Sequence, residues 1–173
     1  INAMDGKRIA VITGSTGGIG AAIADQLAAS GWQLVLVNRN DTKARAQTAD
    51  LQANHPGIAV ETVTADLMDV EQIKTAAQTI VGMHPKLDLL FNNSGVLTSE
   101  RVMSVQRHES NYAVNTLAPY VMTQGLRPAL RNQHAGAKSM IVNTTSSAHN
   151  AAKSLDTTTL SDPKDIGGLT GAY

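Results

Sequence analysis

A glycine-rich turn between two structured segments is the part of this sequence best suited to bind a ligand. The apolar run from Ile9 to Thr13 leads into the turn, and a segment with helical periodicity follows it. This arrangement presents backbone N–H groups and a helix N-terminus to a pyrophosphate, so a dinucleotide is the expected ligand. A flexible surface turn is the alternative interpretation, while a triphosphate loop is excluded because no Gly-Lys-Ser/Thr follows the glycines. The residues expected to contact the ligand here are Gly14, Ser15, Thr16, Gly18, Ile19 and Gly20.

Two polar residues at the end of the next apolar run bear on the choice of dinucleotide. Asn38 lies eighteen residues after Gly20, where an acidic side chain would hold the ribose 2′-hydroxyl of NAD. An uncharged Asn38 does not repel a 2′-phosphate, and Arg39 can bind one through paired N–H donors. The sequence therefore favours NADP over NAD as the cofactor. The alternative interpretation of Arg39 is an ordinary surface arginine.

Polar residues also follow the third and fourth apolar runs. Asp66, with Leu67 beside it, either accepts a hydrogen bond from an adenine amino group or caps the helix that follows. The asparagine-rich run that ends in Asn93, Ser94 and Gly95 either lines the cofactor channel or forms a simple turn. We expect these positions to meet at the carboxyl edge of one sheet.

Strand and helix patterns alternate along the chain. Strands are expected at 7–13, 33–37, 58–64, 87–91 and 139–143, and helices at 18–30, 41–54, 69–81 and 105–132. Asp41 is expected to cap the second helix. This alternation implies right-handed crossovers and an α/β fold with a doubly wound parallel sheet of the Rossmann type, covered on both faces. Residues 4–173 are expected to form a single dinucleotide-binding domain with a long polar loop at 147–172, after a cloning remnant at 1–3.

The composition excludes several other classes of protein. Lysine and arginine together number 14, as do aspartate and glutamate, and without a basic cluster no nucleic-acid partner is expected. The absence of cysteine excludes disulfides and thiolate catalysis. No apolar run approaches the ~20 residues of a membrane helix, no signal peptide is visible, and the five histidines lack metal-ligand spacing. We therefore expect a cytoplasmic protein without a metal site or a membrane partner.

Five motifs in register give the chain a family resemblance. They are Thr13–Gly20, Asp66, Asn92–Gly95, Val114-Asn115 and the run from Ile141 to Asn143 that leads into Ser146-Ser147. With these motifs the sequence resembles the short-chain dehydrogenase/reductase family, over nearly the whole chain from Lys7 to Tyr173. Ser94 is one departure, because the family usually has alanine there. The long interval between Ser146 and Tyr173 is most similar to the retinol-dehydrogenase-like branch.

The resemblance implies hydride transfer between a nicotinamide dinucleotide and a small-molecule carbonyl or alcohol substrate. The family's catalytic residues map to Asn115, Ser146 and Tyr173, with Ser147 as an adjacent alternative for the serine. The lysine of the family's Tyr-x-x-x-Lys motif falls at position 177, past Tyr173. The sheet is therefore expected to be incomplete at its C-terminal side, and this chain by itself is expected to be inactive. A fragment, or the ordered part of a longer chain, is favoured over a natural truncation.

The resemblance also bears on partners. The family's counterpart of the helix that carries Asn115 builds subunit contacts, so the complete protein is expected to be a homodimer or homotetramer. The alternative function is a non-catalytic dinucleotide-binding or regulatory module that kept the fold and lost the chemistry. A lysine four residues after Tyr173 would favour the enzyme over the module.

Overall fold

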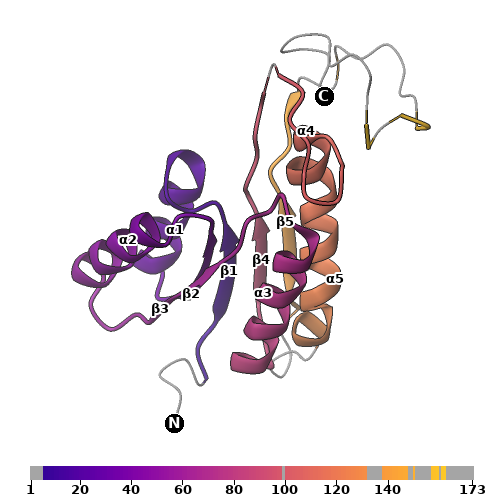
Figure 1. The fold of residues 1–173 in the computed structure, drawn as a ribbon. Coiled ribbons are helices and arrows are strands. Elements are labelled where there is room, and N and C mark those ends of the chain that lie inside the picture. The colour runs from indigo at the N-terminus through magenta and orange to yellow at the C-terminus, as the bar shows by residue number, and fades with distance from the viewer. Residues whose placement is uncertain are drawn as a thin grey trace.

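The protein forms one parallel sheet with helices on both sides, as a computed structural model shows (Figure 1). The structure describes residues 6–98, 100–131, 138–147, 150, 157–159 and 161–162. The expected cloning remnant at 1–3, the catalytic candidate Tyr173 and most of the expected polar loop at 147–172 lie outside these residues.

The strands form the sheet that the alternating sequence pattern predicts. They are β1 (Ile9–Thr13), β2 (Gln33–Asn38), β3 (Val60–Thr64), β4 (Leu89–Asn92) and β5 (Met140–Asn143). Their order in the sheet is β3-β2-β1-β4-β5, and every neighbouring pair is parallel. The chain order reverses between β1 and β4, which is where a doubly wound sheet opens a crevice for a ligand. The predicted doubly wound parallel fold is therefore confirmed.

Helices cover both faces of the sheet. They are α1 (Gly18–Ala29), α2 (Asp41–Asn54), α3 (Val70–Met83), α4 (Ser110–Tyr112), the π-helical turn η1 (Ala113–Leu117) and α5 (Ala118–Arg131). Figure 1 shows α1 and α2 on one side of the sheet, and α3 and α5 on the other. The alternating side chains of β1 divide accordingly: Ala10 and Ile12 pack in the cluster with α1 and α2, while Ile9 and Val11 join the cluster with α3 and α5.

The long helix expected over 105–132 starts later than the sequence suggests. Val105 is 69% exposed, and Arg107 has a φ of 63°, which no helix accommodates. The helix begins at Ser110 because Glu109 caps it, accepting hydrogen bonds from the backbone N–H groups of Asn111 and Tyr112. Residues 105–109 therefore belong to the loop before the helix, and this part of the prediction was wrong.

The cap predicted for α2 was also wrong by one residue. Asn40, not Asp41, is the N-cap, and its side chain accepts a hydrogen bond of 2.9 Å from Lys43 N–H. Asp41 is the first residue of the helix, where its carboxylate accepts from Arg45 Nε at 2.6 Å. For the other helices and strands, the predicted and observed ends differ by no more than two residues.

Candidate functional site

Two glycines of the turn between β1 and α1, Gly14 and Gly20, lie where no space remains for a side chain. Gly14 has a φ of 66°, and a Cβ there would lie 2.5 Å from Ser94 Oγ. A Cβ on Gly20 would collide with the carbonyl oxygen of Gly14 and the side-chain amide of Asn93. These two glycines therefore let α1 pack closely against the ends of β1 and β4.

The opposite side of the turn is open. Gly17 is the N-cap of α1 with no side-chain cap hydrogen bond, and the first turn of the helix holds no acidic residue. Added Cβ atoms on Gly17 and Gly18 would meet nothing within 4 Å. An uncapped helix N-terminus beside open space has the backbone N–H groups and the partial positive charge that suit an anion.

A cavity of about 600 Å³ adjoins this turn, at the carboxyl edge of the sheet. It brings together ten of the predicted cofactor contacts, which are Gly14, Thr16, Ile19, Asn38, Arg39, Asp66, Leu67, Asn93, Ser94 and Gly95. Of the other three, Ser15 and Gly20 are buried beneath the turn and Gly18 is exposed at the start of α1. The polar groups predicted from separate strands therefore do converge on one hollow.

Asn38 lies in this wall, but both atoms of its amide already have partners. Its Oδ1 accepts from Ser15 N–H, and its Nδ2 donates to Ser15 Oγ, each at 2.9 Å. The side chain is 5% exposed. Asn38 thus supports the glycine turn, whereas its exposed neighbour Arg39 borders the cavity together with Lys43.

Asp66 was predicted either to contact the ligand or to cap the next helix. The cap of α3 is Asp69, whose Oδ1 accepts from Glu71 N–H at 3.0 Å. Asp66 Oδ1 instead accepts from Met68 N–H at 2.9 Å, within the short turn before the helix. The capping alternative for Asp66 was therefore wrong, and the residue borders the cavity.

Asn93 joins the ends of β1 and β4. Its backbone N–H donates to Thr13 Oγ1 at 3.0 Å, and its Nδ2 donates to the carbonyl oxygens of Thr13 and Gly14 at 3.1 and 3.0 Å. Ser94 N–H donates to the same Thr13 hydroxyl at 3.1 Å. These bonds tie the ends of β1 and β4 to each other beside the cavity.

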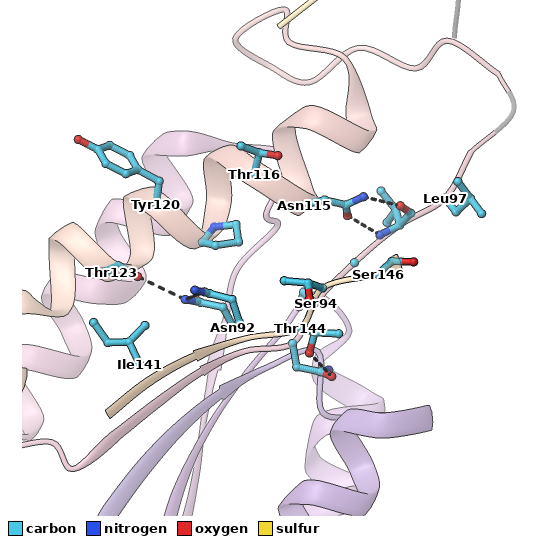
Figure 2. A pocket seen from close by; sticks show the side chains of 16 residues that line it. Asn92, Ser94, Leu97, Asn115, Thr116, Tyr120, Thr123, Ile141, Thr144 and Ser146 are labelled. Carbon is cyan, nitrogen blue, oxygen red and sulfur yellow. Dashed lines mark hydrogen bonds between the residues drawn. The ribbon is translucent and has the colours of Figure 1, made fainter. Parts of the chain in front are cut away.

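A second cavity, of about 830 Å³, continues from the first along the ends of β4 and β5. Figure 2 shows that Asn115, Ser94 and Ser146 all border it. Its walls are mostly apolar, contributed by residues such as Leu97, Tyr120 and Ile141. Two of the three predicted catalytic residues therefore share one hollow, and the third, Tyr173, lies outside the described residues.

Sequence reasoning missed three residues that the geometry makes prominent: Lys43 at the rim of the first cavity, Gln47 beneath the glycine turn and Val96 opposite Asn115. Lys43 and Gln47 are four residues apart and so share a face of α2. That spacing was readable in the sequence. The sequence did not indicate that this face of α2 meets the glycine turn and the first cavity.

Within the described residues, no group of three or more histidine, aspartate or glutamate side chains is placed to hold a metal ion. The same part of the chain contains no helix of the length and apolarity required to cross a membrane.

The fold is a doubly wound parallel sheet with a crevice at its carboxyl edge, and sequence comparison supplies the family. Residues 8–155 match the family model described as short chain dehydrogenase. The chain therefore belongs to the short-chain dehydrogenase/reductase family, as the sequence motifs predicted.

The relatives include human dehydrogenase/reductase SDR family member 12, which is 33% identical over 129 residues that cover 73% of this chain and 40% of the relative. D-threitol dehydrogenase of Mycolicibacterium smegmatis is 32% identical over 154 residues, covering 86% of this chain and 56% of the relative. The chain spans 37–41% of the length of several other curated relatives that it matches.

Solved structures agree with the fold. A metagenomic short-chain oxidoreductase in complex with NADP matches with a TM-score of 0.70 and 29% identity, covering 95% of this chain and 68% of that one. An uncharacterised protein from Mycobacterium paratuberculosis matches with a TM-score of 0.80, covering 99% of this chain and 59% of that one. At 24% identity the second likeness concerns the fold alone.

Proposed function

We propose that this chain is the dinucleotide-binding part of an NAD(P)-dependent oxidoreductase that transfers hydride between the nicotinamide and a carbonyl or alcohol substrate, with NADP preferred. One observation carries the proposal: the open, uncapped turn at α1 lies in a crevice that runs past two cationic side chains at one end and past Asn115 and Ser146 at the other. The NADP complex of a related oxidoreductase supports it.

The residues of the first cavity fit such a ligand. The N–H groups at the start of α1 are oriented to bind a diphosphate, and the space left by Gly17 and Gly18 admits it. Thr16 and Ile19 are exposed beside the turn. Asp66 borders the far wall, where a carboxylate can accept a hydrogen bond from the adenine amino group.

The preference for NADP rests on charge at the end of β2. Arg39 is exposed at the cavity, and Lys43, in the first turn of α2, borders the same cavity. A 2′-phosphate gains charge-assisted hydrogen bonds from these cations. The ribose of NAD lacks that phosphate, and the amide of Asn38 is committed to Ser15. NADP therefore gains interactions here that NAD does not.

The second cavity is where the reaction is proposed to occur. The bound cofactor would supply or accept the hydride, and the chain's own residues would orient the substrate and move its proton. Ser146 would donate a hydrogen bond to the substrate oxygen, and Tyr173 would exchange the hydroxyl proton. Asn115 would help to place a water in the proton path.

The proposal is tested by titrating the intact protein with NADPH and NADH and following nicotinamide fluorescence. We expect NADPH to bind more tightly, and Arg39→Leu to remove most of that advantage, about tenfold or more. Arg45→Leu is the matched control, because Arg45 is an exposed cation of the same helix region that pairs with Asp41. Tighter binding of NADH by the wild type would refute the cofactor preference, and no binding of either would refute the proposed function.

Three further predictions belong to this proposal. The intact protein is expected to be a homodimer or homotetramer, which light scattering measures, and to be cytoplasmic, which cell fractionation measures. Membership of the retinol-dehydrogenase-like branch predicts activity on carbonyl substrates with large apolar groups, consistent with the apolar walls contributed by Leu97, Tyr120 and Ile141.

A further inference from the structure

Ser15 lies in the glycine turn, and its N–H, its carbonyl oxygen and its hydroxyl each form hydrogen bonds to side chains outside the turn. It is 0% exposed. Its N–H donates to Asn38 Oδ1 at 2.9 Å, and its carbonyl oxygen accepts from Gln47 Nε2 at 2.5 Å. Its hydroxyl accepts from Asn38 Nδ2 at 2.9 Å and donates to Gln47 Oε1 at 2.8 Å. The Ser15 clamp, meaning Asn38 and Gln47 together, thus makes four hydrogen bonds to one residue.

Both members of the clamp come from far along the chain. Asn38 ends β2, and Gln47 lies in the middle of α2. The amide of each side chain uses one donor and one acceptor on Ser15, so the two amides are complementary to the three groups that they bind. A turn held in this way has its backbone ordered during folding, and it loses less entropy when a ligand arrives.

The clamp also fixes α2 relative to the turn. Ala44 and Leu51, at 2% and 5% exposure, anchor the buried side of α2, and Gln47 lies between them on that side. Lys43 precedes Gln47 by one helical turn and therefore lies on the same side, where it borders the cavity. Gln47, which binds Ser15, and Lys43, which borders the cavity, are thus both carried by helix α2.

We propose that Gln47 and Asn38 are positioning residues that preform the diphosphate-binding turn, setting the affinity for NADP and NAD alike while leaving the choice between them to Arg39 and Lys43. This inference rests on the proposed function for its ligand. It assigns Asn38 a role through Ser15 in place of the ribose contact that its sequence position suggests. Exchanging Asn38 for aspartate would therefore not create a NAD-preferring protein, because aspartate cannot donate to Ser15 Oγ.

The test measures NADPH and NADH binding to the intact wild type and to Gln47→Ala, with Gln52→Ala as the matched control on the exposed side of α2. Alanine is the best helix former, so Gln47→Ala keeps α2 folded. We expect Gln47→Ala to weaken both dinucleotides by the same factor, about tenfold, with their ratio unchanged. Gln52→Ala should bind as the wild type does.

A double-mutant cycle separates positioning from general destabilisation. If Gln47 acts through Ser15, then Gln47→Ala costs less affinity in a Ser15→Ala background than in the wild type. Hydrogen exchange of the unliganded protein provides a readout that needs no ligand. The amide of Ser15 should exchange faster in Gln47→Ala, and at the wild-type rate in Gln52→Ala.

The outcomes distinguish this inference from the proposed function. Wild-type protein that binds neither dinucleotide overturns the proposed function, and the exchange rate of Ser15 then still decides whether the clamp holds the turn. Additive losses in the double-mutant cycle, a changed ratio of NADPH to NADH affinity, or unchanged exchange at Ser15 each overturn the positioning role. A shift to NADH preference in Asn38→Asp overturns the role assigned to Asn38.

Discussion

Asn115 and Val96 are joined by two hydrogen bonds, although they lie on different elements. Asn115 Nδ2 donates to the carbonyl oxygen of Val96, and the N–H of Val96 donates to Asn115 Oδ1, each at 2.8 Å (Figure 2). Asn115 is in the π-helical turn η1, and Val96 is in the segment after β4. The pair therefore ties the wider helical turn to a segment that lines both cavities.

Replacing Asn115 by leucine should destabilise the protein. Leucine has a similar size but leaves the Val96 N–H and carbonyl without their partners, in a half-buried place. We expect the free energy of unfolding to fall by about 1–3 kcal/mol, measured by urea denaturation. Thr116→Ala, at the exposed neighbouring position, is the control. Equal stability of Asn115→Leu and the control would show that the pair contributes little.

Two glycine-to-alanine changes should differ clearly in their effect on stability. A Cβ at Gly20 collides with the Gly14 carbonyl oxygen and with the Asn93 amide that is hydrogen-bonded to it, so Gly20→Ala should destabilise the fold markedly. A Cβ at Gly82, within α3, meets nothing within 4 Å. Gly82→Ala should therefore be neutral or stabilising by up to about 1 kcal/mol. Thermal unfolding of both variants measures this, and a Gly20→Ala protein as stable as Gly82→Ala would contradict the close packing of α1.

Asp69, the cap of α3, should make the stability of the protein sensitive to acid. The amide of Gln106 lowers the pKa of this carboxyl, with smaller contributions from Glu71 N–H and Gln72, while burial opposes the shift. A carboxyl with a lowered pKa stabilises the native state fully above its unfolded-state pKa of about 3.9. That stabilisation is lost as the pH falls through the lowered native value.

Asp69→Asn retains an acceptor for the cap but removes the titrating group. The stability difference between the wild type and this variant should therefore shrink as the pH is lowered from 5 towards the native-state pKa of Asp69, as urea denaturation at several pH values would show. Asp50→Asn, an exposed change on α2, is the control. A difference that stays constant over this range would contradict the assignment to Asp69.

The central strands of the sheet were predictable because they are buried, and buried strands have mostly apolar sequences. β1 and β2 are buried at every position, and apart from polar residues at their ends their sequences are apolar runs that differ plainly from the helices. The start of the long helix was not predictable in the same way. Val105 has the apolar character of a helix face but is exposed, and Glu109 acts as the cap although glutamate is not a typical capping residue.

The sequence indicated which strand ends form the site, but not the hydrogen bonds that their side chains make. Arg39 and Asp66 were identified because they lie within two residues of strand ends, and strand ends meet at one edge. The hydrogen bonds of Asn38 were not predicted, because its partner Ser15 and Gln47, which binds the same serine, lie 23 and 9 positions away from it in the chain. The pairing of β1 with β2 brings Asn38 to Ser15, and the position of α2 brings Gln47 to the same residue.

Lys43 should contribute to NADP affinity through its charge alone, so its contribution should depend on the salt concentration. The residue borders the first cavity, and its backbone N–H, not its side chain, is bound by the Asn40 cap. Lys43→Gln therefore leaves the cap intact while removing one cation from the place proposed for the 2′-phosphate. At low ionic strength the variant should bind NADPH several-fold more weakly, about three- to tenfold, and NADH as the wild type does.

This loss should diminish as salt is added, because exposed charges are screened over about 8 Å at physiological ionic strength. Titration of NADPH at several salt concentrations measures the effect. Lys74→Gln is the control, since Lys74 is an exposed cation on α3 that pairs with Glu71. A loss that is equal for NADPH and NADH, or that persists unchanged at high salt, would mean that Lys43 acts by holding α2 in place and not by attracting a phosphate.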